Sequence, residues 1–426
     1  MPVRARGPWV VILNGFYILP LVYSYGLLLG YFLEELYRFD GKPMEEADIR
    51  RIMDRAVGQT KKIYYMTSKE KMRRDLEEIL QALFDVAYGR EPSVEIGAMS
   101  LKEYAPNMTA PHRMDLMVSA MTDAGGRWNC NLKCRNCYAA GQPQAGGTEL
   151  SCAEWKQVID RCRKAGIPQL TFTGGEPTMR PDLPEMIGYA RWFVTRVNTN
   201  GVLLTKELCR KLKEASLDSL QITLYSRDEA IHNHLVGADL PGSSGNFQKT
   251  LQGLRNALEA GLDVSVNTPI CRENADYTDT VRFLEQEGVG FVSCSGLIET
   301  GKASQDAALK GQLSIEELSD IVGAAAAYCG EHEMELSFTS PGRADPKRLC
   351  RAGLTIPACG ACLSNMAVAP DGTVVPCQSW LGGVSLGNIL TDEWKMIWNH
   401  PFCRKIRGLT EEETLKCPLR TGKTAP

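Results

Sequence analysis

Short apolar runs alternate with segments of helical periodicity between residues 115 and 300, and this alternation is the strongest constraint on the fold. The apolar runs predict strands, and apolar residues spaced three and four apart between them predict helices. Such alternation indicates a parallel sheet with right-handed crossovers. The strands are expected within residues 114–121, 169–175, 195–200, 219–226, 263–270 and 290–297, with helices at 151–165, 183–192, 205–215, 247–260 and 277–286. We therefore expect an α/β fold, an open or partial (β/α)6 barrel.

Three thiols follow the first predicted strand in one loop, WNCNLKCRNCYAAG, at Cys130, Cys134 and Cys137. The spacing C-x3-C-x2-C is short enough to bind three corners of one cubane iron-sulfur cluster, which leaves the fourth iron without a protein ligand. Zinc is the alternative, but a structural zinc site normally has four protein ligands. No histidine or fourth cysteine lies nearby in the sequence. The chain has 15 cysteines, an odd number, which fits poorly with a fully paired disulfide scaffold.

The cysteine loop is followed, after the second predicted strand, by Gly174-Gly175-Glu176-Pro177. From about residue 120 to 300 this combination resembles the radical S-adenosylmethionine (SAM) superfamily. The resemblance implies a 4Fe-4S cluster whose open iron binds SAM, and an external one-electron reductant of the flavodoxin or ferredoxin type. It also implies reductive cleavage of SAM to a 5'-deoxyadenosyl radical that abstracts hydrogen from a substrate. The chain is then expected to be an oxidoreductase or maturase.

The same resemblance implies the SAM contacts. Glycines allow the backbone to approach a ligand closely, and the Glu176 carboxylate is suited to accept hydrogen bonds from the SAM ammonium group. Polar residues at or near the ends of the later strands are expected to contact the ribose and methionine groups, and Tyr138 is expected near adenine. Those polar residues are Asn200, Thr223, Ser226 and Asn267.

A second group of cysteines lies near the C-terminus, at Cys350, Cys359, Cys362 and Cys377. An Asp371-Gly372 turn between two strand-like runs predicts a hairpin that returns Cys377 towards the Cys359-Cys362 pair. A tetrahedral zinc site is an open alternative for four such thiols.

This segment resembles the SPASM or twitch extension of radical SAM enzymes, in which C-x9-G-x4-C is typical and is matched here by Cys362, Gly372 and Cys377. The resemblance implies one auxiliary 4Fe-4S cluster. Its ligands would be Cys359, Cys362 and Cys377, with either Cys417 or Cys350 as the fourth.

The N-terminal region is apolar from residue 7 to residue 33, without a charged side chain. A run of this length is a candidate for a membrane-spanning helix. The basic residues that follow it predict, by the positive-inside rule, that the rest of the chain lies on the cytoplasmic face. A helix buried in a protein groove is the alternative. Residues 44–90 predict amphipathic helices.

The expected organisation has three parts. A helical N-terminal region covers residues 1–110, a radical SAM core covers 111–330, and a small cysteine-rich α+β extension of the SPASM or twitch type covers 331–426.

The composition excludes two classes of protein. With 44% hydrophobic residues and a formal net charge of -3, the chain is neither disordered nor a dedicated nucleic-acid binder. The stretch that begins ITLYSRDEAIHNHLVG resembles SPASM enzymes that modify ribosomal peptides or proteins, by a thioether, a C-C crosslink or epimerisation. A three-stranded peptide-recognition module is not evident at the N-terminus, which argues against a simple reader of a leader peptide. Two alternatives stay open: a membrane-associated enzyme that modifies lipid chains, and a non-catalytic iron-sulfur sensor or scaffold.

Overall fold

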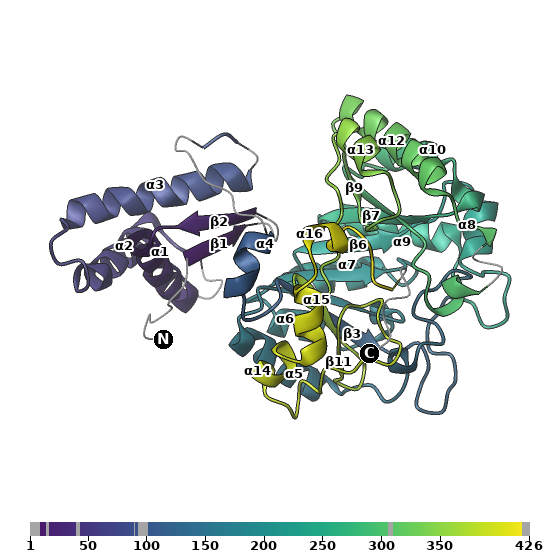
Figure 1. The fold of residues 1–426 in the computed structure, drawn as a ribbon, viewed down its shortest axis with the longest axis horizontal. Coiled ribbons are helices and arrows are strands. Elements are labelled where there is room, and N and C mark those ends of the chain that lie inside the picture. The colour runs from purple at the N-terminus through teal and green to yellow at the C-terminus, as the bar shows by residue number, and fades with distance from the viewer. Residues whose placement is uncertain are drawn as a thin grey trace. The chain divides into compact units, whose positions relative to one another are not determined.

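The computed structural model describes residues 9–13, 17–39, 43–88, 90–92, 101–305 and 310–419. Contacts within the chain separate two compact units, Met1–Met108 and Thr109–Pro426. Figure 1 draws the first unit in purple and blue and most of the second in teal, green and yellow.

The described part of the N-terminal unit is a two-stranded hairpin followed by helices. Its elements are β1 (Trp9–Leu13), β2 (Tyr17–Leu21), α1 (Tyr23–Leu36), η1 (Tyr37–Phe39), α2 (Glu46–Lys61), α3 (Lys69–Ala87), α4 (Leu101–Tyr104) and η2 (Ala105–Asn107). The two strands pair antiparallel, with Trp9 opposite Leu21. The predicted amphipathic helices are confirmed as α2 and α3, which bury Ile52 and Leu76 in a core shared with Phe32 of α1.

The expectation of one apolar membrane helix over residues 7–33 is wrong. The described part of this run divides into β1, β2 and the 14-residue helix α1, while residues 7, 8 and 14–16 lie outside the described residues. The apolar side chains of α1 are used within the unit, because Leu28, Leu29 and Phe32 pack against α2 and α3. Among the residues described, no helix has both the length and the apolarity to cross a membrane.

The second unit is organised around one sheet with the strand order β11-β10-β3-β4-β5-β6-β7-β8-β9. Neighbouring strands are parallel except for β10 and β11, which form an antiparallel pair. The strands are β3 (Arg113–Ser119), β4 (Gln169–Gly174), β5 (Val194–Thr199), β6 (Ser219–Thr223), β7 (Val264–Ile270), β8 (Phe291–Gly296), β9 (Glu335–Phe338), β10 (Asn365–Val368) and β11 (Val374–Val375). The six predicted strands are confirmed as β3 to β8, and β9, β10 and β11 extend the sheet beyond them.

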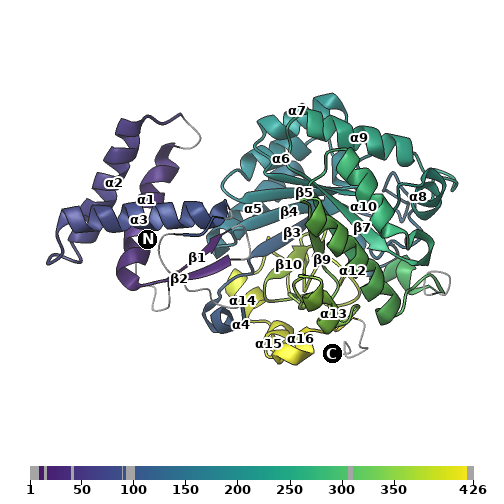
Figure 2. The same cartoon turned by 90° about the horizontal axis from the view of Figure 1, so that it is seen from above.

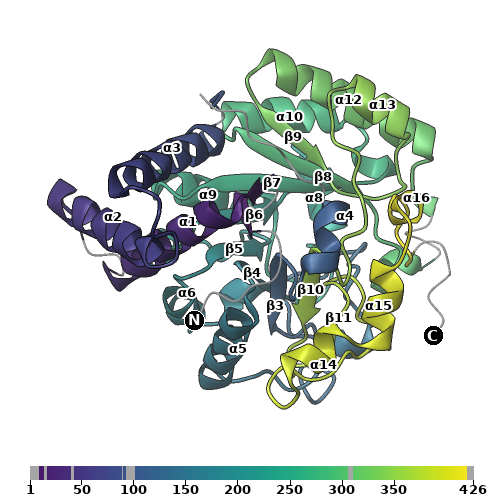
Figure 3. The same cartoon turned by 60° about the vertical axis from the view of Figure 1, so that its left-hand side comes forward.

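Helices cover the outer face of this curved sheet (Figure 2), and the C-terminal helices lie near its β10–β11 end (Figure 3). The α-helices described in the second unit are α5 (Cys152–Ala165), α6 (Leu183–Tyr189), α7 (Lys206–Glu214), α8 (Glu229–Leu235), α9 (Phe247–Glu259), α10 (Tyr277–Gln286), α12 (Ile315–Glu331), α13 (Pro346–Arg351), α14 (Trp394–Trp398), α15 (Pro401–Arg407) and α16 (Glu411–Thr414). Local signals fix their ends. Ser151 and Glu154 form a capping box at the start of α5, and Gly166, at φ 85°, ends it.

The two faces of the sheet differ in polarity. Buried apolar residues such as Phe172, Val197 and Leu220 alternate along the strands with polar residues such as Thr171, Arg196 and Gln221. Successive strand residues point to opposite faces of the sheet. The apolar residues therefore lie on one face, and the polar residues lie on the other. The polar set lines a cavity.

Candidate functional site

The cavity has a volume of about 460 Å³ and is lined by residues along the polar face of the strands, from the loop after β3 and from the C-terminal segment. Cys130, Cys134 and Cys137 all line it. Their thiols are free and partly exposed. The loop is held in place by neighbouring loops, because the Cys130 Sγ donates to Gly175 O at 3.3 Å and Lys302 N donates to Cys137 O at 2.9 Å.

The protein environment favours the neutral thiols when no metal is bound. Burial raises the pKa of all three, and that of Cys134 rises to about 12, where the neighbouring Cys137 adds to the effect. Lys302 opposes this shift at Cys134 and Cys137. The donor set fits an iron-sulfur cluster: one loop presents three sulfur ligands to a cavity that has room beside them. Among the residues described, no three His, Cys, Asp or Glu side chains are grouped so as to hold a single metal ion.

The Gly-Gly-Glu-Pro segment lies directly against the end of β3. A Cβ at Gly174 would stand 2.2 Å from Ser119 O, and one at Gly175 would stand 2.8 Å from Ala120 O, so only glycine fits at either position. Gly174 also has φ 134°, which disfavours other residues. Pro177 begins the short helix η4 (Pro177–Met179).

Glu176 is almost completely buried, at 1% exposure, and yet lines the cavity. Its Oε1 accepts from the Thr178 amide at 3.0 Å, from the Thr178 hydroxyl at 2.5 Å and from the Thr199 hydroxyl at 2.6 Å. Its Oε2 accepts from the Asn200 amide at 2.8 Å. Burial raises the pKa of Glu176, and these donors oppose the rise. The carboxylate is thus fixed, and Oε2, with a single donor, has capacity for a further one.

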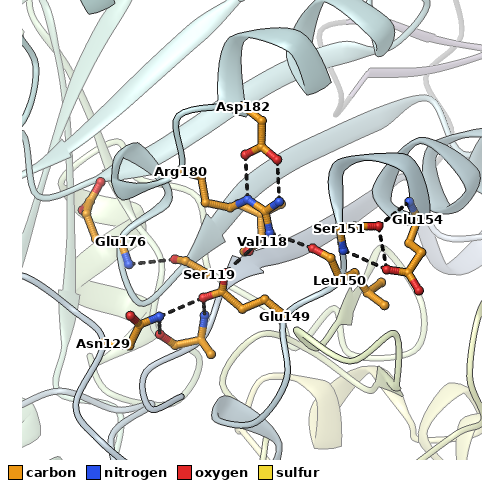
Figure 4. A network of polar contacts seen from close by, with 11 residues as sticks. Val118, Ser119, Asn129, Glu149, Leu150, Ser151, Glu154, Glu176, Arg180 and Asp182 are labelled. Carbon is orange, nitrogen blue, oxygen red and sulfur yellow. Dashed lines mark hydrogen bonds and ion pairs between the residues drawn. The ribbon is translucent and has the colours of Figure 1, made fainter. Parts of the chain in front are cut away.

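A network of polar contacts joins this segment to the cysteine loop (Figure 4). Arg180 donates to Val118 O at 3.0 Å and to Leu150 O at 2.8 Å, and forms a two-pronged ion pair with Asp182. The carboxylate of Glu149 accepts from Asn129 Nδ2 at 2.8 Å.

That Glu149 carboxylate also accepts from Ala120 N at 2.9 Å. Asn129 directly precedes Cys130. The network therefore couples the position of the first cysteine to the end of β3.

The other residues predicted to contact SAM are mostly brought together. Asn200, Thr223, Asn267 and Tyr138 line the cavity. Asn200 Nδ2 donates to Asn131 Oδ1 at 2.7 Å, next to the first cysteine. Ser226 differs, because it is fully buried outside the cavity and its Oγ accepts from Asp228 N at the start of α8.

The C-terminal cysteines divide into two sets. The predicted hairpin at Gly372 is confirmed by the pairing of β10 with β11. Cys359, Cys377 and Cys417 line the same cavity as the first cysteine loop.

Cys362 is fully buried outside the cavity, with its thiol hydrogen-bonded to that of Cys403. This hydrogen bond and the Arg407 guanidinium lower the pKa of Cys403. Cys350 is exposed on α13, so of the two candidates for a fourth ligand only Cys417 shares the cavity.

Sequence reasoning missed several polar cavity residues on β3, β4 and β5, among them Arg113, Thr171, Arg196 and Asn198. Polar residues two apart within a predicted strand, as in TRVNTN, were the available signal.

Comparison with known proteins identifies two domains. A family model described as the radical SAM superfamily matches residues 129–284, and one described as the SPASM iron-sulfur cluster-binding domain matches residues 359–418. These domains imply a 4Fe-4S cluster with SAM and an auxiliary iron-sulfur cluster.

The similar proteins are named for two kinds of activity, that of a porphyrin synthase and that of a peptide cyclase. An Fe-coproporphyrin III synthase from Methanosarcina barkeri is 36% identical over 197 residues, which are 45% of this chain and 47% of that protein. A PqqA peptide cyclase from Granulibacter bethesdensis is 27% identical over 292 residues, 66% of this chain and 74% of that protein. The chain thus matches about half the length of the first of these relatives.

Among solved structures, Streptococcus suis SuiB bound to its precursor peptide SuiA has a TM-score of 0.63 at 13% identity. The alignment covers 98% of this chain and 95% of that one. At this identity the similarity concerns the fold.

Proposed function

This chain carries a radical SAM domain followed by a SPASM iron-sulfur domain, and we propose that it is an enzyme that cleaves SAM reductively and abstracts hydrogen from a peptide or protein substrate. The observation that carries the proposal is the shared cavity: three cysteines of one loop, the fixed carboxylate of Glu176 and three C-terminal cysteines all line it. The cluster, SAM and a substrate would therefore meet in the same cavity.

The residues of the chain have separate tasks in this proposal. Cys130, Cys134 and Cys137 would hold the SAM-binding cluster, and Glu176 would accept a hydrogen bond from the SAM ammonium group through Oε2. When bound and reduced by an external flavodoxin or ferredoxin, the cluster and SAM supply a primary carbon radical. The cavity walls would exclude water and hold the substrate hydrogen close to this radical.

The C-terminal cysteines would hold one auxiliary cluster. Cys359, Cys377 and Cys417 share the cavity, whereas Cys362 lies three residues after Cys359 and is buried outside it. A cluster at this place could pass an electron to or from the substrate site, because the same cavity connects the two groups of thiols.

A peptide substrate is supported by the peptide cyclase relatives and by the similarity of fold to SuiB, which has been crystallised with its precursor peptide. A step in heme synthesis is the second candidate, favoured by the 36% identity to the Fe-coproporphyrin III synthase and by 32% identity over 180 residues to an AdoMet-dependent heme synthase. Products of the two reactions differ in mass and absorption, so the alternatives separate experimentally.

The first test is anaerobic SAM cleavage by the reconstituted, reduced protein, with 5'-deoxyadenosine measured by mass spectrometry. The wild type should form it, and Cys134→Ala should not. Cys152→Ala is the matched control, because this thiol lies at the start of α5 and does not line the cavity. Absence of 5'-deoxyadenosine from the wild type would favour a non-catalytic iron-sulfur protein.

The second test is co-expression with candidate precursor peptides, followed by mass spectrometry of the peptide. A loss of hydrogen that depends on Cys134 supports peptide modification. Conversion of an iron porphyrin by the same preparation, without any change in peptide mass, would support the second candidate.

A further inference from the structure

One of the arginines that line the cavity forms no salt bridge with a carboxylate among the described residues. Arg196 lies on β5, lines the cavity and is half-buried. Its only hydrogen bond within the described chain runs from Nε to Ser219 Oγ, at 3.2 Å. The four N–H donors of Nη1 and Nη2 are left over. A half-buried guanidinium with unused donors indicates a site that an anion would complete.

The charges around Arg196 do not balance. Asp115 is buried at 1% exposure, but its carboxylate pairs with Arg113 Nε at 2.9 Å. Asp263 is exposed, so water screens its charge. Burial and the charge of Arg113 lower the pKa of Arg196 despite the opposing effects of Asp115 and Asp263. The guanidinium groups of Arg113 and Arg196 are thus balanced by one buried carboxylate, that of Asp115. This leaves one positive charge, which a single carboxylate of a ligand would neutralise.

Two neighbours of Arg196 carry unpaired polar atoms. Thr171 on β4 is paired in register with Arg196, and its buried hydroxyl has no hydrogen-bond partner within the described chain. Asn198 lies two residues after Arg196 on the same face, and its buried Oδ1 also has no partner there. All three residues line the cavity. Their strands, β4 and β5, are neighbours in the sheet (Figure 2). A buried polar atom without a partner costs free energy unless water or a ligand satisfies it, so these atoms are available to a ligand that enters the cavity.

The chemistry of these atoms points to one kind of ligand group. The planar guanidinium and the Thr171 hydroxyl can both donate to a carboxylate, whereas Asn198 Oδ1 can only accept, and so needs an N–H group. A carboxylate with an N–H nearby is what an acidic residue in a peptide presents.

Position also separates this group from the SAM contacts. Thr199, which donates to Glu176, lies three residues further along β5, about 10 Å from Arg196 at the usual strand rise. Arg196 and Thr171 therefore lie further from the carboxyl ends of β5 and β4 than Thr199 and Glu176 do.

We propose that Arg196, Thr171 and Asn198 form a subsite for an acidic residue of a peptide substrate, with Arg196 and Thr171 binding its carboxylate and Asn198 accepting a backbone N–H. The proposal rests on the proposed function, because it assigns the cavity to a substrate. It names the class of substrate residue that the cavity selects.

The test measures binding of small probes to the full-length, anaerobically reconstituted protein by saturation-transfer NMR. The probes are N-acetyl-glutamate N-methylamide and its neutral isostere N-acetyl-glutamine N-methylamide, with N-acetylglycine as a chain-terminal carboxylate. The wild type should bind the glutamate probe about 10-fold or more tighter than the glutamine probe, since a hydrogen bond to a charged group is lost in the second. Tighter binding of N-acetylglycine than of the glutamate probe would overturn the assignment to an acidic side chain.

Arg196→Met should abolish the difference between the two amide probes, and Arg196→Lys should restore part of it. Arg210→Met is the matched control, because Arg210 is an exposed arginine of α7 paired with Glu214, and it should discriminate as the wild type does. Thr171→Val is the milder variant if Arg196→Met folds poorly, and it should weaken the glutamate probe alone by about 10-fold.

The proposal fails if the wild type does not discriminate, or if discrimination persists in both Arg196→Met and Thr171→Val. Loss of auxiliary iron in Arg196→Met, with discrimination unchanged in Thr171→Val, would assign Arg196 to the cluster instead. SAM cleavage is measured separately in every variant. Discrimination without SAM cleavage would reject the proposed function and keep the subsite, and the reverse result would reject the subsite alone.

Discussion

Replacing Arg180 with methionine should loosen the connection between β3 and the Gly-Gly-Glu-Pro segment. The Arg180 side chain is only 11% exposed, and its removal leaves the carbonyls of Val118 and Leu150 without their donor. A buried polar group that loses its partner costs about 1–3 kcal/mol, so two such groups, partly relieved by rearrangement, give about 3 kcal/mol. That value corresponds to about a 150-fold increase in local opening.

Hydrogen exchange followed by mass spectrometry measures this opening at the amides of Ala120 and Glu176, which both lie in the network. Arg161→Met is the matched control, because Arg161 also donates to two backbone carbonyls but at the exposed surface of α5. It should cost less than about 1 kcal/mol, since water can replace an exposed donor. Equal exchange in the two variants would refute the argument that burial makes the Arg180 contacts costly to lose.

Three further predictions concern stability, measured by chemical unfolding followed by circular dichroism. Burial lowers the pKa of His232 to about 4, so between pH 6.5 and 4 only the unfolded chain binds a proton at this side chain. The free energy of unfolding should therefore fall by about 3 kcal/mol as the pH drops through that window. His232→Asn should lack this part of the pH dependence. Leu76→Ala should destabilise the N-terminal unit by about 2–5 kcal/mol, whereas Leu33→Ala, at a position 37% exposed, should cost less than about 1 kcal/mol. Gly253→Ala should destabilise α9, because its Cβ would stand 1.9 Å from Gly201 O, whereas Gly58→Ala in α2 meets no atom within 4 Å and should stabilise by up to about 1 kcal/mol.

Each of these expectations has a clear contrary result. A pH slope unchanged in His232→Asn would mean that this side chain is already neutral in the unfolded chain or charged in the folded one. Equal changes in the free energy of unfolding for the two leucine variants would contradict the argument from burial. Equal changes for the two glycine variants would contradict the argument from the close approach at Gly253.

The central sheet was predictable because its strands are buried and regularly spaced. Residues such as Phe172 and Leu220 alternate with polar neighbours, and each strand is followed by a helix with clear end signals, such as the capping box at Ser151. The additional strands were not predictable in the same way. β11 has only two residues and β9 and β10 have four each, which is too short for a periodic pattern.

The N-terminal prediction failed for a different reason. A long uncharged run has the same average hydropathy whether it spans a bilayer or folds into short buried elements. The partners that decide the matter are Ile52 and Leu76 of α2 and α3, which lie far along the chain and pack against α1. Nothing local in the run indicates them.

The site was predictable where the residues are adjacent in sequence, as in the loop of Cys130, Cys134 and Cys137. It was not predictable where the chain brings distant residues together. The contact of Cys362 with Cys403 and the position of Arg196 beside Thr171 both depend on the sheet register and the course of the C-terminal segment.

The parallel pairing of β3 with β10 has a consequence for biosynthesis. Arg113 is opposite Asn365, so one edge of β3 waits for a partner that the ribosome makes about 250 residues later. At 5–20 residues per second, synthesis of that stretch takes about 12–50 s. During this interval the strand leading into the first cysteine loop has an open edge, which is prone to pair with other chains. Iron and sulfide that reached the nascent cysteine loop would therefore bind beside a sheet that still lacks β10. A stalled or truncated chain would likewise expose an edge of β3 that the complete protein covers.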